Sequence, residues 1–244
     1  MNQVTLNEQQ RTHLQTMKIF FGHQSVGDNI LDGIRDLMTA DPALKLNIVS
    51  SANPEAVAGP AFVEAHIGAN RDPSSKTTAF TTIMAQGMGS QGGVAFYKYC
   101  YVDFGSTTDV PQVFQTYQSQ VADLHRMYPG LKLVHITVPL TAEEKAPSFT
   151  DSAKNTLRRL LGREANVKRN EFNRLLKKTY ADKEPLFDLA EVESTHADGT
   201  RSYYNRGFDK VYTLAREWTT DGGHLNETGR RAAAQKLLHV LAGL

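Results

Sequence analysis

The chain contains a single cysteine, Cys100, so it cannot form an internal disulfide bond. It also lacks a long apolar run, since none approaches the roughly 18 residues of a membrane-spanning helix. An excess of charge of one sign is missing too, because 27 Lys and Arg residues face 26 Asp and Glu residues, a formal net charge of +1. Without a net field, we expect no nucleic-acid partner and no binding to an anionic membrane.

The first ten residues, MNQVTLNEQQ, lack the basic stretch and the following apolar stretch of a signal peptide. The sequence as given therefore predicts a soluble, cytoplasmic protein. A periplasmic or secreted protein would follow if a signal peptide had been removed, and exported proteins can also lack disulfides.

The length and composition are those of a globular protein. The sequence has 244 residues, of which 40% are hydrophobic and 22% are charged, enough to bury a sizeable core. It shows no internal repeat, no low-complexity tract and no linker, so we expect residues 1–244 to form a single domain. The sequence does not predict the oligomeric state.

Apolar runs alternate with segments of helical periodicity along most of the chain. The predicted strands are Lys18–Phe21, Leu44–Val49, Val94–Tyr101, Leu131–Val138 and Leu186–Leu189. The predicted helices are Asn7–Met17, Gly27–Met38, Lys76–Met88, Val110–Tyr128, Asp151–Gly162, Val167–Tyr180 and Asn226–Leu241. The segment between the second strand and the third helix is predicted to be a loop. This alternation predicts an α/β fold with a mostly parallel five-stranded sheet, whose ligands bind beyond the carboxyl ends of the strands.

Ser25 follows directly on the first strand, in the stretch GHQSVGD. One interpretation is a capping box, in which Ser25 accepts from the backbone of residue 28 and Asp28 reaches back. The other is a nucleophile, because the free N–H groups of a helix N-terminus stabilise a developing oxyanion. The two roles do not exclude each other.

A serine nucleophile needs a base, and His224 is the candidate among eight histidines. Asp221 lies three residues before it, across Gly222-Gly223, so a tight turn would let the carboxylate hold the imidazole. The alternative is a surface loop in which Asn226 caps the last helix.

The Gly-x-x-Ser turn after the first strand and the Asp-x-x-His-Leu-Asn segment before the last helix resemble the SGNH/GDSL hydrolases in arrangement, from Lys18 to Leu241. The resemblance implies a flavodoxin-like, three-layer α/β/α sandwich. It also implies ester hydrolysis by a triad of Ser25, His224 and Asp221, with no cofactor and no metal.

The same resemblance assigns an oxyanion hole to the backbone N–H groups of Ser25 and Gly68. The family usually has a Gly-x-Asn-Asp segment after the third strand. Here Val102 stands where the asparagine would fall, and Asp103 is retained. We therefore take Asn70 as the candidate replacement. Loss of one such donor costs about 10²–10³ in rate.

Several other residues are candidates for substrate contact. His23 and Gln24 stand next to the serine, where the family usually has Gly-Asp, and a structural imidazole is the alternative for His23. Asp103 lies near the predicted sheet end. Tyr204 and Trp218 could form a platform for a sugar or an acyl group, or could simply pack inside the fold.

Charged residues give further expectations. Arg71 and Lys76 could bind an anionic group, although solvated surface charges are the commoner case. Lys98 lies in a predicted buried strand and needs a carboxylate partner such as Asp103. The basic stretch Arg163–Tyr180 has apolar residues at helical spacing, which indicates an ordinary amphipathic helix and no nucleic-acid role.

These observations predict a serine esterase that forms an acyl-enzyme on Ser25. The resemblance to the SGNH/GDSL hydrolases further implies a small-molecule or carbohydrate ester substrate with a short acyl group, in particular an O-acetyl ester of a carbohydrate. The main alternative is a catalytically inactive protein of the same fold that binds carbohydrate or acts as a scaffold. A metal-dependent hydrolase would use histidines such as His23, His66, His196 and His224, but no metal-ligand spacing supports it.

Overall fold

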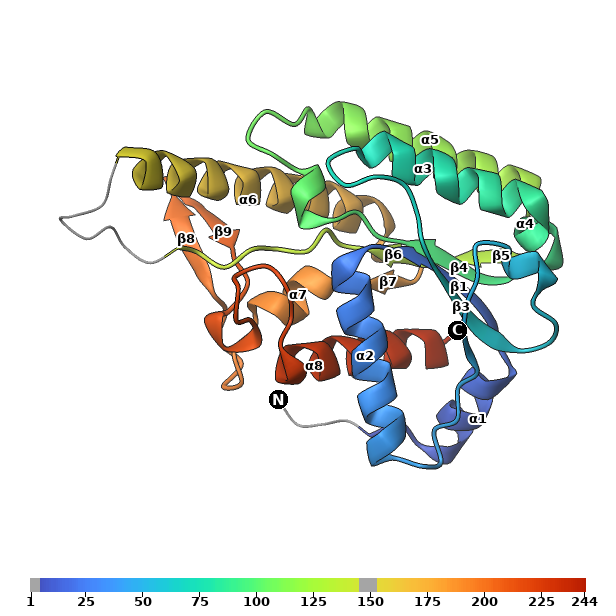
Figure 1. The fold of residues 1–244 in the computed structure, drawn as a ribbon. Coiled ribbons are helices and arrows are strands. Elements are labelled where there is room, and N and C mark those ends of the chain that lie inside the picture. Colours follow the sequence, from blue (N-terminus) through green and yellow to red (C-terminus); the bar gives the residue numbers. More distant parts are fainter. Residues whose placement is uncertain (1–4, 145–152) are drawn as a thin grey trace.

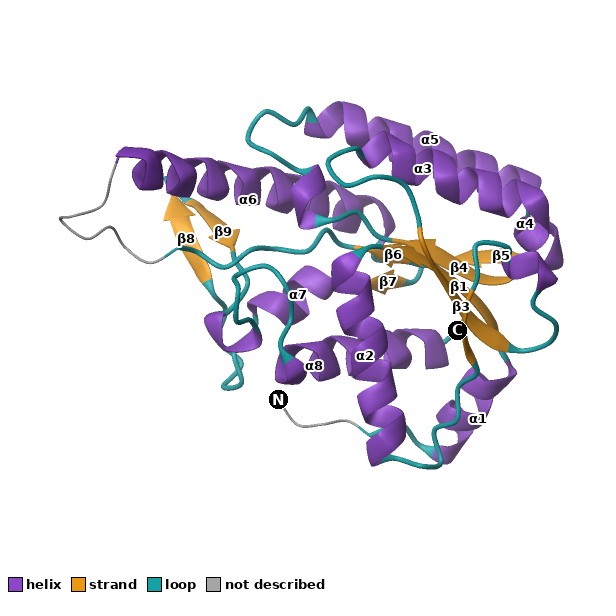
Figure 2. Ribbon diagram, viewed as in Figure 1, coloured by secondary structure: helices purple, strands orange, loops and turns teal. Residues whose placement is uncertain are grey.

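The computed structural model describes residues 5–144 and 153–244, and its centre is a five-stranded, all-parallel sheet (Figure 2). The strand order is β2-β3-β1-β4-β5. The strands are β1 (Lys18–His23), β2 (Ile48–Ser50), β3 (Ala61–His66), β4 (Gly93–Tyr97) and β5 (Leu131–Leu133). The predicted α/β class and the five-stranded sheet are thus confirmed.

A short ladder extends this sheet. Strand β6 (His135–Ile136) follows β5 after one residue, Val134, whose N–H donates to Ala95 O in β4, and β6 pairs in parallel with β7 (Leu186–Phe187). The strands from β3 through β1, β4 and β5/β6 to β7 therefore follow the flavodoxin-like order, and β2 adds an edge strand.

Helices cover both faces of the sheet (Figure 1). One layer holds α1 (Glu8–Thr16), α2 (Ser25–Ala40), α7 (Leu189–Ser194) and α8 (Glu227–Ala242). The other holds α3 (Pro73–Ile83), α5 (Val110–Met127) and α6 (Ala153–Tyr180). The shorter elements are the 3₁₀ turns η1 (Pro54–Ala56), η3 (Tyr101–Asp103) and η4 (Arg216–Trp218), the π-helical turn η2 (Met84–Met88), α4 (Gly89–Gln91) and the hairpin β8 (Tyr203–Arg206)–β9 (Asp209–Tyr212).

Alternation along the strands explains the three layers. Successive side chains of a strand point to opposite faces, so neighbouring Phe20 and Phe21 enter different cores. Phe21 packs against Phe62 and Phe96 on the α2–α8 side, while Phe20 stacks on Phe80 of α3. Each such burial contributes about 1.5–3 kcal/mol, so the first strand anchors both layers.

The sequence prediction missed β3, which pairs with β1 along its whole length. The richness of the segment in Ala, Pro and Gly indicates a loop, and Glu64 interrupts the apolar run that a buried strand would show. In the structure, Glu64 is only 9% exposed and its carboxylate binds His23. The predicted strand Leu44–Val49 is also displaced, since β2 covers only Ile48–Ser50.

The helix predictions need three corrections. The two predicted helices between Asp151 and Tyr180 form one, α6, and residues 151–152 lie outside the described part of the chain. The predicted helix Lys76–Met88 starts earlier, at Pro73, and continues into the π-helical turn η2. Helix α2 begins at Ser25, two residues before the predicted start.

None of the helices in the described ranges is both long and apolar enough to span a bilayer.

Candidate active site

Ser25 is the first residue of α2, directly beyond the carboxyl end of β1. The N-cap is Gln24, which has an extended backbone and makes no side-chain cap hydrogen bond. The predicted capping box is therefore wrong: the Ser25 hydroxyl lies 3.0 Å from Nε2 of His224, and Asp28 contacts His66 instead. Among the described residues no side chain accepts from the first N–H groups of α2, so the positive end of the helix dipole stays available to an anion.

Asp221 and His224 meet in a tight turn, as the spacing predicted. Nδ1 of His224 lies 2.6 Å from Oδ2 of Asp221. The other oxygen, Oδ1, accepts the backbone N–H groups of Gly223 and His224, each at 2.8 Å. Burial raises the pKa of Asp221, but these hydrogen bonds and the imidazole outweigh it and hold the pKa well below its usual range. The carboxylate therefore stays ionised and orients the imidazole.

The two glycines of Asp-Gly-Gly-His make this turn possible. Gly222 has φ +90°, in the left-handed region that side chains disfavour. A Cβ on Gly223 would lie 2.8 Å from the ring of Tyr101, whose centroid is 5.7 Å from that of His224. Tyr101 thus packs beside the imidazole, a contact that sequence reasoning missed.

Two further contacts join this turn and the helix after it, α8, to α2. The N–H of Leu225 donates to Oδ1 of Asn29, which lies one helical turn after Ser25. Deeper in the pair of helices, the guanidinium of Arg230 in α8 binds Asp36 of α2 at 2.8 Å. The hydroxyl and the imidazole are therefore held by two packed helices and not by a loop alone.

The loop after β3 carries the predicted oxyanion residues. The amide of Gln24 donates to the carbonyls of Ile67 and Gly68, at 3.2 and 3.0 Å, which ties this loop to the turn that carries Ser25. Asn70 and Arg71 are exposed, and Arg71 adopts φ +69°. No contact among the described residues joins Asn70 to Ser25, so its role as an oxyanion donor stays a prediction.

A buried ion pair supports the same loop. Lys76 and Asp103 form a salt bridge of 2.9 Å with fully buried side chains. Lys76 also donates to Ala69 O, and Asp103 accepts the backbone N–H of Arg71. Lys76 is thus not a surface charge, and Asp103 is not placed to touch a substrate. Lys98, for which Asp103 was the predicted partner, contacts the sulfur of Cys100 at 3.6 Å.

The remaining predicted substrate contacts are mostly inside the fold. His23 is fully buried and binds Glu64, while Gln24 is occupied by the loop carbonyls. The hydroxyl of Tyr204 donates to Arg163 O, and Trp218 Nε1 donates to Thr195 O. The structure gives no support for an aromatic platform made by Tyr204 and Trp218, because both are less than 10% exposed.

The four histidines of the metal-hydrolase alternative are not brought together, since His196 pairs with Glu217 and His224 with Asp221. A different group lies close enough to hold a metal ion within the described residues. One ligand atom each from His23, Asp28 and His66 lie within 4.8 Å of one another.

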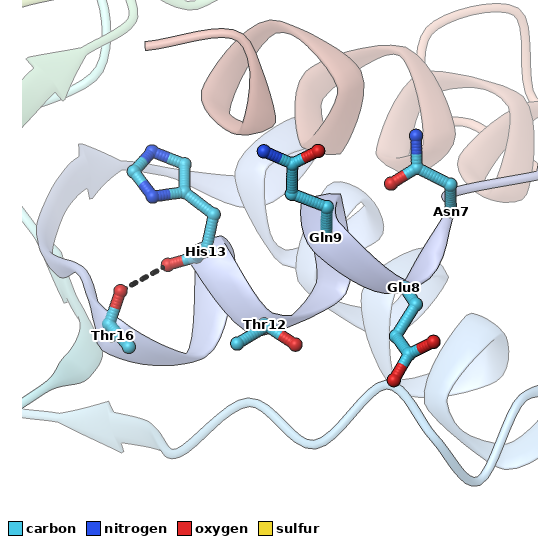
Figure 3. A pocket seen from close by; sticks show the side chains of 6 residues that line it. All are labelled: Asn7, Glu8, Gln9, Thr12, His13 and Thr16. Atoms are coloured by element: carbon cyan, nitrogen blue, oxygen red, sulfur yellow. Dashed lines mark hydrogen bonds between the residues drawn. The ribbon is translucent and has the colours of Figure 1, made fainter.

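A hollow over α1 is shown in Figure 3. It is open, and its six lining residues are all polar: Asn7, Glu8, Gln9, Thr12, His13 and Thr16. Helix α1 precedes β1 and so lies at the amino ends of the strands, opposite Ser25. The hollow is therefore not part of the candidate active site.

No family model and no curated protein matches the chain. Solved structures do match it. A GDSL-like lipase from Bacteroides thetaiotaomicron is 12% identical, over 93% of this chain and 88% of the lipase, with a TM-score of 0.54. A protein from Streptococcus pneumonia, provisionally described as a platelet activating factor, is 14% identical over 96% of this chain and 92% of its own, with a TM-score of 0.52. The chain thus has the fold of the GDSL-like hydrolases, as the sequence motifs predicted.

Proposed function

We propose that this chain is a serine esterase whose nucleophile is Ser25. The observation that carries the proposal is the hydrogen-bonded chain from the Ser25 hydroxyl to His224, at 3.0 Å, and on to Asp221, at 2.6 Å. These are the distances at which a base takes a hydroxyl proton and a carboxylate orients the base. The shared fold with a GDSL-like lipase supports the same conclusion.

In the proposed reaction, Oγ of Ser25 attacks the ester carbonyl while Nε2 of His224 takes its proton. The tetrahedral oxyanion lies at the N-terminus of α2, where the N–H of Ser25 and that of Gly68 donate to it, with the Asn70 amide as a further candidate. The oxyanion collapses, the C–O bond to the alcohol breaks, and His224 protonates the leaving oxygen. Water then attacks the acyl-enzyme with His224 again as the base, which releases the acid and restores Ser25.

For the substrate, we propose a short acyl ester, in particular an O-acetyl group on a carbohydrate. The resemblance of the two motifs to the SGNH/GDSL hydrolases supports this choice. The site is compatible with a polar alcohol, because His224 and Asp221 have side chains 39% and 53% exposed.

Labelling with a fluorophosphonate tests the nucleophile directly. We expect one equivalent of label on Ser25, p-nitrophenyl acetate turnover in the unmodified chain, and a loss of roughly 10⁴-fold or more in Ser25→Ala. Ser90→Ala is the matched control: Ser90 is also in a helix, but it precedes β4 and so lies at the opposite end of the sheet. An unlabelled Ser25 and turnover equal to that of Ser25→Ala would support the inactive binding protein instead.

A further inference from the structure

His23 has one ring nitrogen without a partner. The side chain is fully buried, and Nε2 lies 2.9 Å from the carboxylate of Glu64. Nδ1 is also buried but has no hydrogen-bond partner among the described residues. Its nearest charged neighbour is Oδ1 of Asp28, at 3.8 Å, too far for a hydrogen bond. A buried polar atom without a partner is costly, so its presence calls for a reason.

Glu64 decides which nitrogen of His23 carries a proton. The carboxylate of Glu64 lies 2.9 Å from Nε2 of His23, and a carboxylate can only accept in such a contact. Nε2 therefore donates, and in the neutral ring the lone pair of Nδ1 remains free. That lone pair and the carboxylate of Asp28 are both electron-rich, so a cation between them would be stabilised by each.

A second imidazole completes the group. Nε2 of His66 lies 2.8 and 3.1 Å from the two oxygens of Asp28, and the rings of His23 and His66 are 5.0 Å apart. All three ligand atoms lie within 4.8 Å of one another. Ligands about 2.0–2.1 Å from a tetrahedral zinc ion are about 3.3 Å apart, so these separations need only small side-chain movements.

We propose that His23, Asp28 and His66 form a binding site for a divalent transition-metal ion of the zinc type. Two imidazoles and one carboxylate are the donors that zinc prefers. Glu64 takes the role of the outer carboxylate that fixes the tautomer of a metal-bound histidine. Asp28 and His66 are 45% and 56% exposed, which leaves a path for the ion and room for a water ligand.

The three ligands come from three segments that surround the nucleophile. His23 ends β1, Asp28 lies in the first turn of α2, and His66 ends β3 just before the predicted oxyanion loop. An ion held by all three would clamp the serine turn to that loop. This inference does not rest on the proposed esterase activity, because metal binding can be measured without a substrate.

The test uses the full chain, stripped of metal with a chelator and titrated calorimetrically with Zn²⁺. We expect one equivalent to bind, an increase in the unfolding temperature, and a four-coordinate visible spectrum when Co²⁺ replaces Zn²⁺. His66→Ala and Asp28→Asn should each weaken binding at least ~100-fold, and Glu64→Gln about 10–100-fold. His66→Ala and Asp28→Asn change exposed side chains, so circular dichroism should show that both variants are folded.

His196→Ala is the matched control, because His196 also pairs with a carboxylate, Glu217, but belongs to no three-residue metal-ligand group among the described residues. It should bind Zn²⁺ like the unmodified chain. The proposal is overturned if the unmodified chain binds no Zn²⁺. It is equally overturned if His66→Ala binds Zn²⁺ with unchanged affinity, which would place the ion elsewhere.

Discussion

Asp221 uses its two oxygens for different tasks. Oδ1 accepts backbone N–H groups and shapes the turn, while Oδ2 accepts from the imidazole of His224. In Asp221→Asn the amide oxygen can keep the backbone contacts, so the NH₂ group would face Nδ1. Nδ1 must then accept, which leaves the proton on Nε2 and removes the base that the proposed reaction requires.

We therefore expect Asp221→Asn to stay folded and to lose about 10⁴-fold in kcat on p-nitrophenyl acetate. Asp198→Asn is the control, since Asp198 also accepts two hydrogen bonds within a turn but belongs to no part of the proposed site. A loss below tenfold in Asp221→Asn would show that His224 does not depend on this carboxylate.

Glu193 in α7 is a buried acid whose charged form is destabilised by its surroundings. It is 1% exposed, Oε2 accepts from the N–H of Leu140, and Oε1 has no partner among the described residues. Burial raises the pKa of Glu193 to about 8 from 4.5. Between these values the unfolded chain binds fewer protons than the folded chain, so stability falls as pH rises, by up to ~1.4 kcal/mol per pH unit.

Glu193→Gln should remove this fall in folding stability with rising pH, because glutamine does not ionise. We expect the variant to gain stability relative to the unmodified chain as pH rises from 5 to 8, measured by urea unfolding at each pH. Glu191→Gln, an exposed acid in the same helix, should show no such trend. Parallel stability curves for Glu193→Gln and the unmodified chain would contradict the expectation.

At the scale of elements, the turn from β1 to α2 depends on Gly27, which has no side chain. A Cβ on Gly27 would lie 2.3–2.5 Å from three atoms of His23. The imidazole of His23 therefore packs directly on the first turn of α2, and this close packing requires glycine at position 27. Gly162, by contrast, lies in α6, where a Cβ would meet no described residue within 4 Å apart from its own helical turn.

Replacing each of these two glycines with alanine should change the stability of the chain in opposite directions. Gly27→Ala should destabilise the chain by about 1–3 kcal/mol because the ring must move. Gly162→Ala should stabilise it by about 0.5–1 kcal/mol, since alanine is the better helix former. Chemical denaturation measures both, and equal effects in the two variants would rule out the close contact at Gly27.

The elements differ in how well the sequence predicted them. Strand β1 and helix α8 were predictable because their apolar periodicity is uninterrupted. Strand β3 was not, because the residue that breaks its pattern, Glu64, is buried in contact with His23 of β1, 41 residues earlier in the chain. The same holds for the role of Ser25, since local sequence favours a cap and only the contact with His224 shows where the hydroxyl points.

At the scale of the whole molecule, two cores share one sheet. Trp218, the only tryptophan, lies in the core on the α2–α8 side, and the buried Tyr97, Tyr99 and Tyr117 lie in the other. If residues 1–244 form one domain, both cores should unfold together. We expect tryptophan fluorescence, near-ultraviolet dichroism of the tyrosines and far-ultraviolet dichroism to give one urea midpoint. Separate midpoints would show two independent units.

The hydroxyl of Ser25 and the ring of His224 are 199 residues apart in sequence. During translation the chain emerges with the serine first, and the histidine follows only after almost every other element. Helix α8, which packs on α2, is likewise made after the sheet that it covers. If Ser25 is the nucleophile that we propose, a nascent chain carries its hydroxyl without the base for most of its synthesis, so ribosome-bound intermediates should not react with the fluorophosphonate until α8 has docked.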